Sequence, residues 1–130
     1  MIVGLNEGKL DGELAALQMI SQVKPSALVI IAFMPIHGTA MENVAPPKPA
    51  DIAKVVAIAR QMFPLTPLVL GCMRPKGKAR AETDVLALKA GVDAVAFPSD
   101  EAIEYAKSRG FGTTFSSYCC AQIYADLAGK

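Results

Sequence analysis

The sequence carries little net charge, and this shortage argues against two classes of partner. Its 130 residues include 13 Lys and Arg against 12 Asp and Glu, so the formal net charge at pH 7 is +1. Only 19% of the residues are charged, whereas attraction of a polyanion needs a strong field of one sign. We therefore expect the protein to bind neither nucleic acid nor an anionic membrane surface.

Long apolar runs and an export leader are also missing. The longest apolar run, Ala27 to Met34, ends at Pro35 and is far shorter than the roughly 18 residues needed to span a bilayer. The first residues lack the basic start and cleavage-site pattern of a secretory signal. Three cysteines cannot all pair with one another. Together these features favour a reducing cytoplasm and predict no membrane segment.

Hydrophobic residues are abundant, at 52%, which is enough to give one domain of this length a substantial core. Short apolar runs alternate with segments of helical periodicity, and this alternation is typical of a parallel α/β fold. Strands are expected at residues 2–5, 27–33, 68–72 and 94–97. The second run has no polar alternation, so we expect a central strand that is covered on both faces.

A helix is expected after each of these strands. The first covers residues 10–21, the second passes through 52–59 and stops at Pro64, and the third passes through 85–88 toward Gly91.

The fourth helix has the clearest end signals. Ser99 suits its N-cap, acidic residues 100–101 its first turn, and Gly110 its end. Beyond it, residues 111–115 are expected to form a short fifth strand and residues 118–127 a closing helix.

Ligands of parallel α/β folds bind beyond the carboxyl ends of the strands, where the loops converge. The corresponding segments here are residues 6–9, 34–43, 73–80 and 98–99. The second of these begins a Pro-rich loop that extends to about Lys48, and loops of this length are uncommon unless they form part of a site.

Arg74 is the strongest single candidate for a site residue. It follows Cys72 by two residues and Leu70 by four, so strand alternation predicts that all three side chains share one side. A buried arginine needs an acidic, anionic or metal-cluster partner, which leaves a site role and a structural ion pair as alternatives. Cys72 either shares that site or fills the core.

Other strand-end residues carry weaker signals. Glu7 either accepts a hydrogen bond from a ligand amine or is a solvated loop residue. His37, the only histidine, stands beside Gly38 and Thr39, where it contacts a ligand or is incidentally exposed. Met34 falls at a strand end and is a candidate ligand contact.

Two further groups of residues are expected to be structural. Lys76, Lys78 and Arg80 suit a solvated face better than a phosphate clamp. Cys119 and Cys120 are adjacent and project in different directions from a helix, so core packing is favoured over a metal pair.

Four segments, in order along the chain, carry a family resemblance. Ile2-Val3-Gly4-Leu5-Asn6-Glu7 is similar to the later part of a G-x-I-x-G-x-x-E element, and His37-Gly38-Thr39-Ala40-Met41 is similar to a K-G-T-P-L loop. Residues 52–64 follow an I-A-V-A-R-x-M-x-P helix, and Leu70-Gly71-Cys72-Met73-Arg74 looks like an L-S-A-G-R strand end. Over residues 1–109 the chain thereby resembles the biotin synthase-like branch of the radical S-adenosylmethionine enzymes.

This resemblance implies a fold and a set of site residues. The fold is strands five to eight of a (βα)₈ TIM-type barrel with a C-terminal helix, as one partial-barrel domain over residues 1–130. Gly4, Asn6 and Glu7 would approach the adenine of S-adenosylmethionine. Arg74 would hold the position of the arginine that ligates the auxiliary iron–sulfur cluster of biotin synthase.

The resemblance also implies that the chain is incomplete as an enzyme. The C-x₃-C-x₂-C loop that binds the catalytic [4Fe–4S] cluster belongs to the first strand of the barrel, and the three cysteines here do not supply that spacing. The chain is therefore expected to be inactive alone, with no catalytic residue, metal ligand or bound cofactor of its own. It would contribute to the pocket of a longer enzyme that acts on a small molecule, in cofactor biosynthesis or sulfur insertion.

The exposed strand edges of a half-barrel predict a partner, either a second copy of the chain or an N-terminal half-barrel. Glu7, the Gly38-Thr39 turn and Arg74 are expected to face one shared hollow. Two alternatives remain: a cluster-free module that binds a nucleotide or an anion without turnover, and an open flavodoxin-like sheet with an interaction role. Strand order distinguishes the barrel half from the open sheet.

Overall fold

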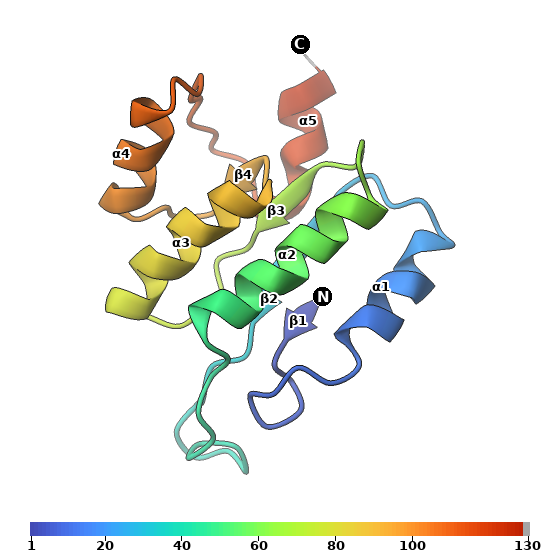
Figure 1. Cartoon of the computed structure of the whole chain (residues 1–130), viewed down its shortest axis with the longest axis vertical. Helices are drawn as coiled ribbons and strands as arrows, with labels where there is room; N and C mark the ends of the chain where they lie inside the picture. Colours follow the sequence, from blue (N-terminus) through green and yellow to red (C-terminus); the bar gives the residue numbers. More distant parts are fainter. Residues whose placement is uncertain (129–130) are drawn as a thin grey trace.

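The computed structural model describes residues 1–128 as one parallel sheet with helices packed against it (Figure 1). The elements in chain order are β1 (Ile2–Val3), α1 (Glu13–Ser21), β2 (Leu28–Ala32), α2 (Pro49–Met62), β3 (Leu68–Leu70), α3 (Lys78–Ala90), β4 (Ala94–Val95), α4 (Asp100–Ser108), the 3₁₀ turn η1 (Cys120–Gln122) and α5 (Ile123–Ala128). Figure 1 shows α1, α2 and α3 in front of the sheet, with α5 on its far side. Within this part of the chain, no helix has the length and apolar content to cross a lipid bilayer.

The four strands are all parallel and lie side by side in sequence order. In register, Leu28 of β2 lies opposite Leu68 of β3, and Leu70 lies opposite Val95 of β4. An open flavodoxin-like sheet has a switched strand order, which this sheet does not have. The prediction of a parallel α/β fold is confirmed, and the sequential order is compatible with a partial (βα)₈ barrel.

The main core lies between the sheet and the helices. Buried Leu28, Ile30 and Ala32 of β2 belong to the same cluster as the apolar face of α2. Val29 and Ile31, on the opposite face of the strand, are only half-buried. The prediction that β2 is fully covered on both faces is therefore wrong, because the helices cover one face and leave the other partly open.

Helix ends follow local chemistry closely. The predicted start of α4 is confirmed, since Ser99 is its N-cap and the Ser99 Oγ accepts a hydrogen bond from the Ala102 N–H at 3.3 Å. Gly91 ends α3 in the left-handed conformation, with φ 104°, as predicted. The first helix begins at Glu13 and not near residue 10, because Gly12 with φ 95° interrupts the chain just before it.

Two strand predictions are wrong. Residues 111–115 form no strand; they are exposed and make no ladder with β4 or any other described strand. The third strand ends at Leu70 instead of continuing to residue 72, because the Gly71 carbonyl already accepts a hydrogen bond from the Arg74 side chain at 2.6 Å. The predicted closing helix is present only as η1 and α5.

Candidate functional site

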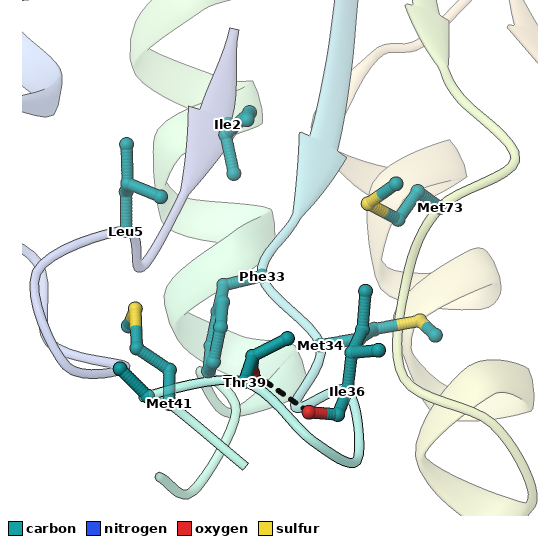
Figure 2. A pocket seen from close by; sticks show the side chains of 9 residues that line it. Ile2, Leu5, Phe33, Met34, Ile36, Thr39, Met41 and Met73 are labelled. Carbon is teal, nitrogen blue, oxygen red and sulfur yellow. Dashed lines mark hydrogen bonds between the residues drawn. The ribbon is translucent and has the colours of Figure 1, made fainter.

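An open hollow of about 320 Å³ lies beyond the carboxyl ends of β1 and β2 (Figure 2). Its walls come from four segments: the end of β1, the stretch after β2, the long loop and the start of the loop after β3. The lining residues are Ile2, Leu5, Phe33, Met34, Ile36, Thr39, Ala40, Met41 and Met73. The hollow occupies the edge of the sheet where ligands of parallel α/β folds bind.

The lining of this hollow is apolar. Thr39 is its one lining side chain with a hydroxyl, and the Thr39 Oγ1 already donates a hydrogen bond to the Ile36 carbonyl at 2.7 Å. Met34, Met41 and Met73 bring three flexible thioethers to the same space, and such side chains adapt to ligands of irregular shape. The site therefore suits an apolar or sulfur-containing group better than a charged one.

The long loop is held by a short network around Glu42. The Glu42 carboxylate accepts a hydrogen bond from the Gly38 N–H at 2.7 Å and lies 3.1 Å from the His37 Nδ1. His37 is fully exposed and neither it nor Gly38 lines the hollow, whereas the next residue, Thr39, does. The loop thus contributes residues from its first half to the site and presents its only histidine to solvent.

At the end of β1, two of the three residues expected near a cofactor already have protein partners. The Gly4 N–H donates to the Glu13 Oε1 at 2.8 Å, and the Asn6 amide donates to the Asp11 carboxylate at 2.9 Å. Glu7 is exposed, with φ 51°, and does not line the hollow. Of the three, the Glu7 carboxylate is the group open to an incoming hydrogen-bond donor.

Glu13 is a polar residue that the sequence patterns missed. It is the first residue of α1 and is 9% exposed. Its Oε1 binds the Gly4 amide, while its buried Oε2 has no hydrogen-bond partner among the described residues. The sequence feature that could have identified Glu13 is an acidic residue that directly follows a glycine at the start of a helix.

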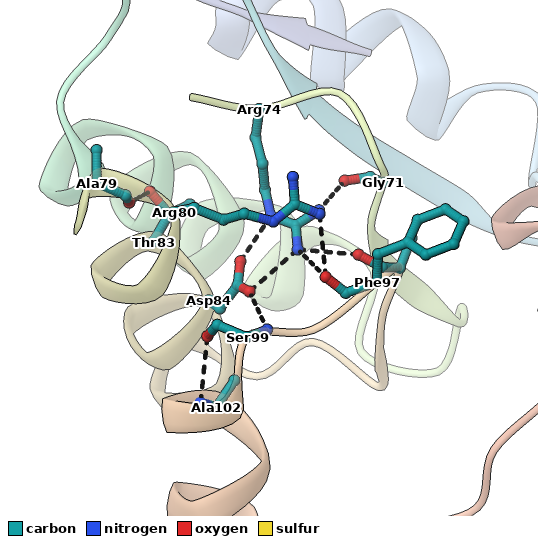
Figure 3. Close-up of polar contacts among 10 residues, drawn as sticks. Gly71, Arg74, Ala79, Arg80, Thr83, Asp84, Phe97, Ser99 and Ala102 are labelled. Carbon is teal, nitrogen blue, oxygen red and sulfur yellow. Dashed lines mark hydrogen bonds and ion pairs between the residues drawn. The ribbon is translucent and has the colours of Figure 1, made fainter. Parts of the chain in front are cut away.

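Arg74 lies in a fully buried ion pair with Asp84 of α3 (Figure 3). The Arg74 Nε lies 2.6 Å from the Asp84 Oδ1, and its Nη2 lies 3.1 Å from the Asp84 Oδ2. The remaining donors reach backbone carbonyls, with Nη1 at 2.6 Å from that of Gly71 and Nη2 at 2.9 Å from that of Ala96. Two roles were expected for Arg74, a site role and a structural ion pair. This geometry is that of a structural ion pair.

Asp84 also connects the ion pair to α4. Its Oδ2 accepts a hydrogen bond from the Ser99 N–H at 2.9 Å, so one carboxylate joins the loop after β3, the helix α3 and the N-terminus of α4. This is the position that an external anion would take between Arg74 and a helix N-terminus. The protein fills it with a carboxylate of its own.

The three groups expected to share a hollow are not brought together. Thr39 lines it, but Arg74 is buried against α3 and Glu7 lies in the exposed turn after β1. The shared side predicted for Leu70, Cys72 and Arg74 is also wrong, since Cys72 is exposed while the other two are buried. Strand alternation fails there because β3 has ended before residue 72.

The basic residues after β3 separate into different environments. Lys76 and Lys78 are exposed, whereas the Arg80 Nη2 donates to the Phe97 carbonyl at 3.0 Å. Lys76 also belongs to a second hollow of about 310 Å³ between the long loop and the start of α3, which is lined by Met34, Pro35, Pro46, Pro75, Lys76 and Ala79. The lysine therefore has access to a concave surface as well as to solvent.

Core packing of the cysteines is not observed. Cys72 and Cys119 are exposed, and Cys120 is only half-buried. Among residues 1–128, no three side chains of the His, Cys, Asp and Glu types are grouped so as to hold a metal ion. With Arg74 committed to Asp84, the residues present do not fit an iron–sulfur cluster.

Among curated proteins, the chain is similar to the biotin synthase of Ruthia magnifica subsp. Calyptogena magnifica, with 31% identity over 77 residues. The aligned residues cover 58% of this chain and 24% of that biotin synthase. The chain thus matches about a quarter of the length of this relative. No family model matches the chain, and no solved structure matches it.

Proposed function

We propose that this chain is the C-terminal part of a radical S-adenosylmethionine enzyme related to biotin synthase, in which it supplies strands five to eight of a (βα)₈ barrel. The similarity to biotin synthase carries the proposal. Two features of the structure support it: the sequential order of the parallel strands, and a hollow at the carboxyl edge where barrel enzymes bind their ligands. Residues 1–130 form one partial-barrel domain in this proposal.

The candidate residues other than Arg74 are assigned to the proposed pocket as follows. Glu7 accepts a hydrogen bond from S-adenosylmethionine, while Gly4 and Asn6 shape the turn that presents it. Met34 and Thr39 contact the small-molecule substrate in the apolar hollow.

His37, Gly38 and Cys72 are exposed, and they contact a substrate only after a second half-barrel covers them. A [4Fe–4S] cluster would be held by that half and not by the residues of this chain, and it would supply the electron for cleavage of the sulfonium.

The proposed partner is an N-terminal half-barrel, either earlier in the same polypeptide or in a separate chain. Among the described strands, β1 and β4 each have one neighbour, so each leaves one edge free for pairing. A second copy of this chain is the other partner that such edges accept. The reducing cytoplasm is the compartment that suits both the cluster and the free cysteines.

The decisive experiment is to determine the intact mass and the N-terminal sequence of the protein in its native cells. We expect either a longer polypeptide with C-x₃-C-x₂-C upstream of residue 1 or a co-purifying chain that carries this motif. A native protein that starts at Met1 and has no such partner would contradict the proposal.

The isolated chain is expected to be inactive in reductive cleavage of S-adenosylmethionine. After anaerobic incubation with iron and sulfide it should lack the visible absorbance of a [4Fe–4S] cluster, because no cysteine set of the required spacing is present. The same treatment of the longer native protein, or of the chain mixed with its upstream half, should produce both the absorbance and 5′-deoxyadenosine. Cleavage by the isolated chain would show that the assignment is wrong.

A cluster-free binding module is the second candidate function, and the second hollow favours it because Lys76 places an ammonium group there. A bound anion should then stabilise the fold, by about 2.7 kcal/mol at a ligand concentration of 100 times Kd. We expect thermal-shift assays with nucleotides and simple anions to detect this gain, and the Lys76→Ala variant to lose it. Lys78→Ala is the matched control, since Lys78 is equally exposed but does not line the hollow. The absence of any shift would exclude this function.

A further inference from the structure

The three cysteines come from two distant parts of the chain, and the fold brings the turn that carries two of them to β3, the strand that precedes the third. Cys72 lies two residues beyond that strand, Cys119 is the N-cap of η1, and Cys120 is its first residue. The turn η1 lies against β2 and β3, so the tail of the chain returns to the strand end that carries Cys72. Cys72 is also among the neighbours that influence the pKa of the Cys120 thiol.

The cluster has accessible thiols, and none of them is in a disulfide. Cys72 and Cys119 are exposed, and Cys120 is half-buried. Hydrogen bonds from the Ala121 backbone and from the Cys120 side chain lower the pKa of Cys119, whereas burial and the neighbouring Cys119 raise the pKa of Cys120. Of the adjacent pair, Cys119 is therefore the thiol more readily ionised, and the thiolate is the reactive form.

The turn that presents these thiols is held in place locally. The Cys119 N–H donates to the Gln122 Oε1 at 3.3 Å, and the Cys119 side chain accepts from the backbone of the same residue in a capping box. Ile123, the next residue, is buried against the body of the protein. The residues that directly follow the thiol pair therefore fix it to the fold.

We propose that Cys72, Cys119 and Cys120 form a thiol–disulfide exchange site, which a small disulfide such as oxidised glutathione converts into a covalent link between Cys72 and the tail. This inference rests on the placement of the cysteines and not on the relationship to biotin synthase.

Formation of this disulfide is a balanced reaction when oxidised glutathione is the oxidant. The Cys119 thiolate attacks one sulfur of oxidised glutathione, forms a mixed disulfide and releases one glutathione thiolate. The Cys72 thiolate then attacks the Cys119 sulfur and releases the second glutathione. Two protein thiols lose two electrons and two protons, and one glutathione disulfide becomes two thiols. Cys72 resolves the mixed disulfide because a ring between adjacent Cys119 and Cys120 would strain the planar peptide bond and the disulfide torsion.

Peptide mapping of the full chain tests this inference. The reduced protein is treated with oxidised glutathione, its remaining thiols are alkylated, and it is digested with trypsin without a reductant. Because Pro75 blocks cleavage after Arg74, Cys72 is carried by the peptide of residues 61–76, and the paired cysteines by residues 110–130. We expect these two peptides to be joined by a bond that reductant removes, and the number of alkylated thiols to fall from three to one.

Single variants assign the steps. Cys72→Ser should abolish the link and leave glutathione on the tail peptide, and Cys119→Ser should slow formation of the link. An unchanged rate in Cys119→Ser would overturn its role as the entering thiol. Oxidised wild-type protein whose three thiols stay alkylatable, or carry glutathione with no internal link, would overturn the site itself. Far-ultraviolet circular dichroism of the reduced variants checks the fold, and the wild-type map decides the question on its own.

Discussion

Replacing Arg74 by alanine is expected to lower the free energy of unfolding by about 3 to 5 kcal/mol, because it leaves a buried carboxylate without its counter-charge. Both Arg74 and Asp84 are 0% exposed, and their side chains are joined by two hydrogen bonds. The Asp84 carboxylate also accepts a hydrogen bond from the Ser99 N–H. A shift of the unpaired carboxylate would therefore also disturb the start of α4. Urea denaturation followed by circular dichroism measures the change.

Two control variants distinguish the effect of breaking the buried ion pair from the effect of removing an arginine side chain in general. Arg80→Ala removes a half-buried arginine with one hydrogen bond, to the Phe97 carbonyl, and should cost about 1 kcal/mol. The double variant Arg74→Met with Asp84→Leu should recover much of the stability, since an apolar pair of similar volume needs no desolvated charge. If Arg74→Ala is no less stable than Arg80→Ala, the ion pair is not structural, and a ligand role for Arg74 is favoured instead.

Replacing Gly8 by alanine is expected to lower the free energy of unfolding by about 2 to 4 kcal/mol, the sum of left-handed backbone strain and overpacking. Gly8 has φ 76°, and a Cβ atom at this position would overlap the backbone carbonyl oxygen of Ala45. A backbone atom cannot rotate away as a side chain can, so the long loop itself must shift. Because this loop supplies Thr39 and Met41 to the apolar hollow, the variant should also deform the site.

Gly38→Ala is the matched control for this contact. Gly38 lies in the same long loop with φ 81°, but a Cβ atom there would meet nothing within 4 Å. Only the strain of the left-handed backbone then applies, at about 1 to 2 kcal/mol. Thermal and urea unfolding of the two variants, measured in parallel, would show the difference in stability. Equal losses of stability would contradict close packing of the long loop against Gly8.

The apolar character of the hollow changes the expected role of the strand-end residues. Charged groups such as Glu7 and Arg74 attract attention in a sequence because they need partners. In the fold, Arg74 finds its partner inside the protein and Glu7 stays in solvent, while methionines and Phe33 form the concave surface. Under the proposed function, polar chemistry at this edge would come from a bound cofactor or from a second half-barrel.

The sequence by itself determined the features that depend on neighbouring residues. The alternation of apolar strands with helices predicted the parallel α/β class, and Ser99 and Gly91 marked helix ends that the structure places at the same residues. These signals are local, because a helix cap or a helical period depends on residues within one or two turns of each other. The same patterns located the edge of the sheet at which the hollow lies.

Only the tertiary structure decided which distant side chains meet. Asp84 is the partner of Arg74 because α3 packs beside the strand end, and η1 lies against β2 and β3 because the tail of the chain folds back onto the sheet. No periodicity records such contacts, since they depend on how whole elements pack and on where a strand stops pairing. Residues 111–115 were predicted to be a strand from their composition, but a strand also needs a partner for its backbone hydrogen bonds. The tail does not pair with the free edge of β4 or with any other described strand, so these residues form none.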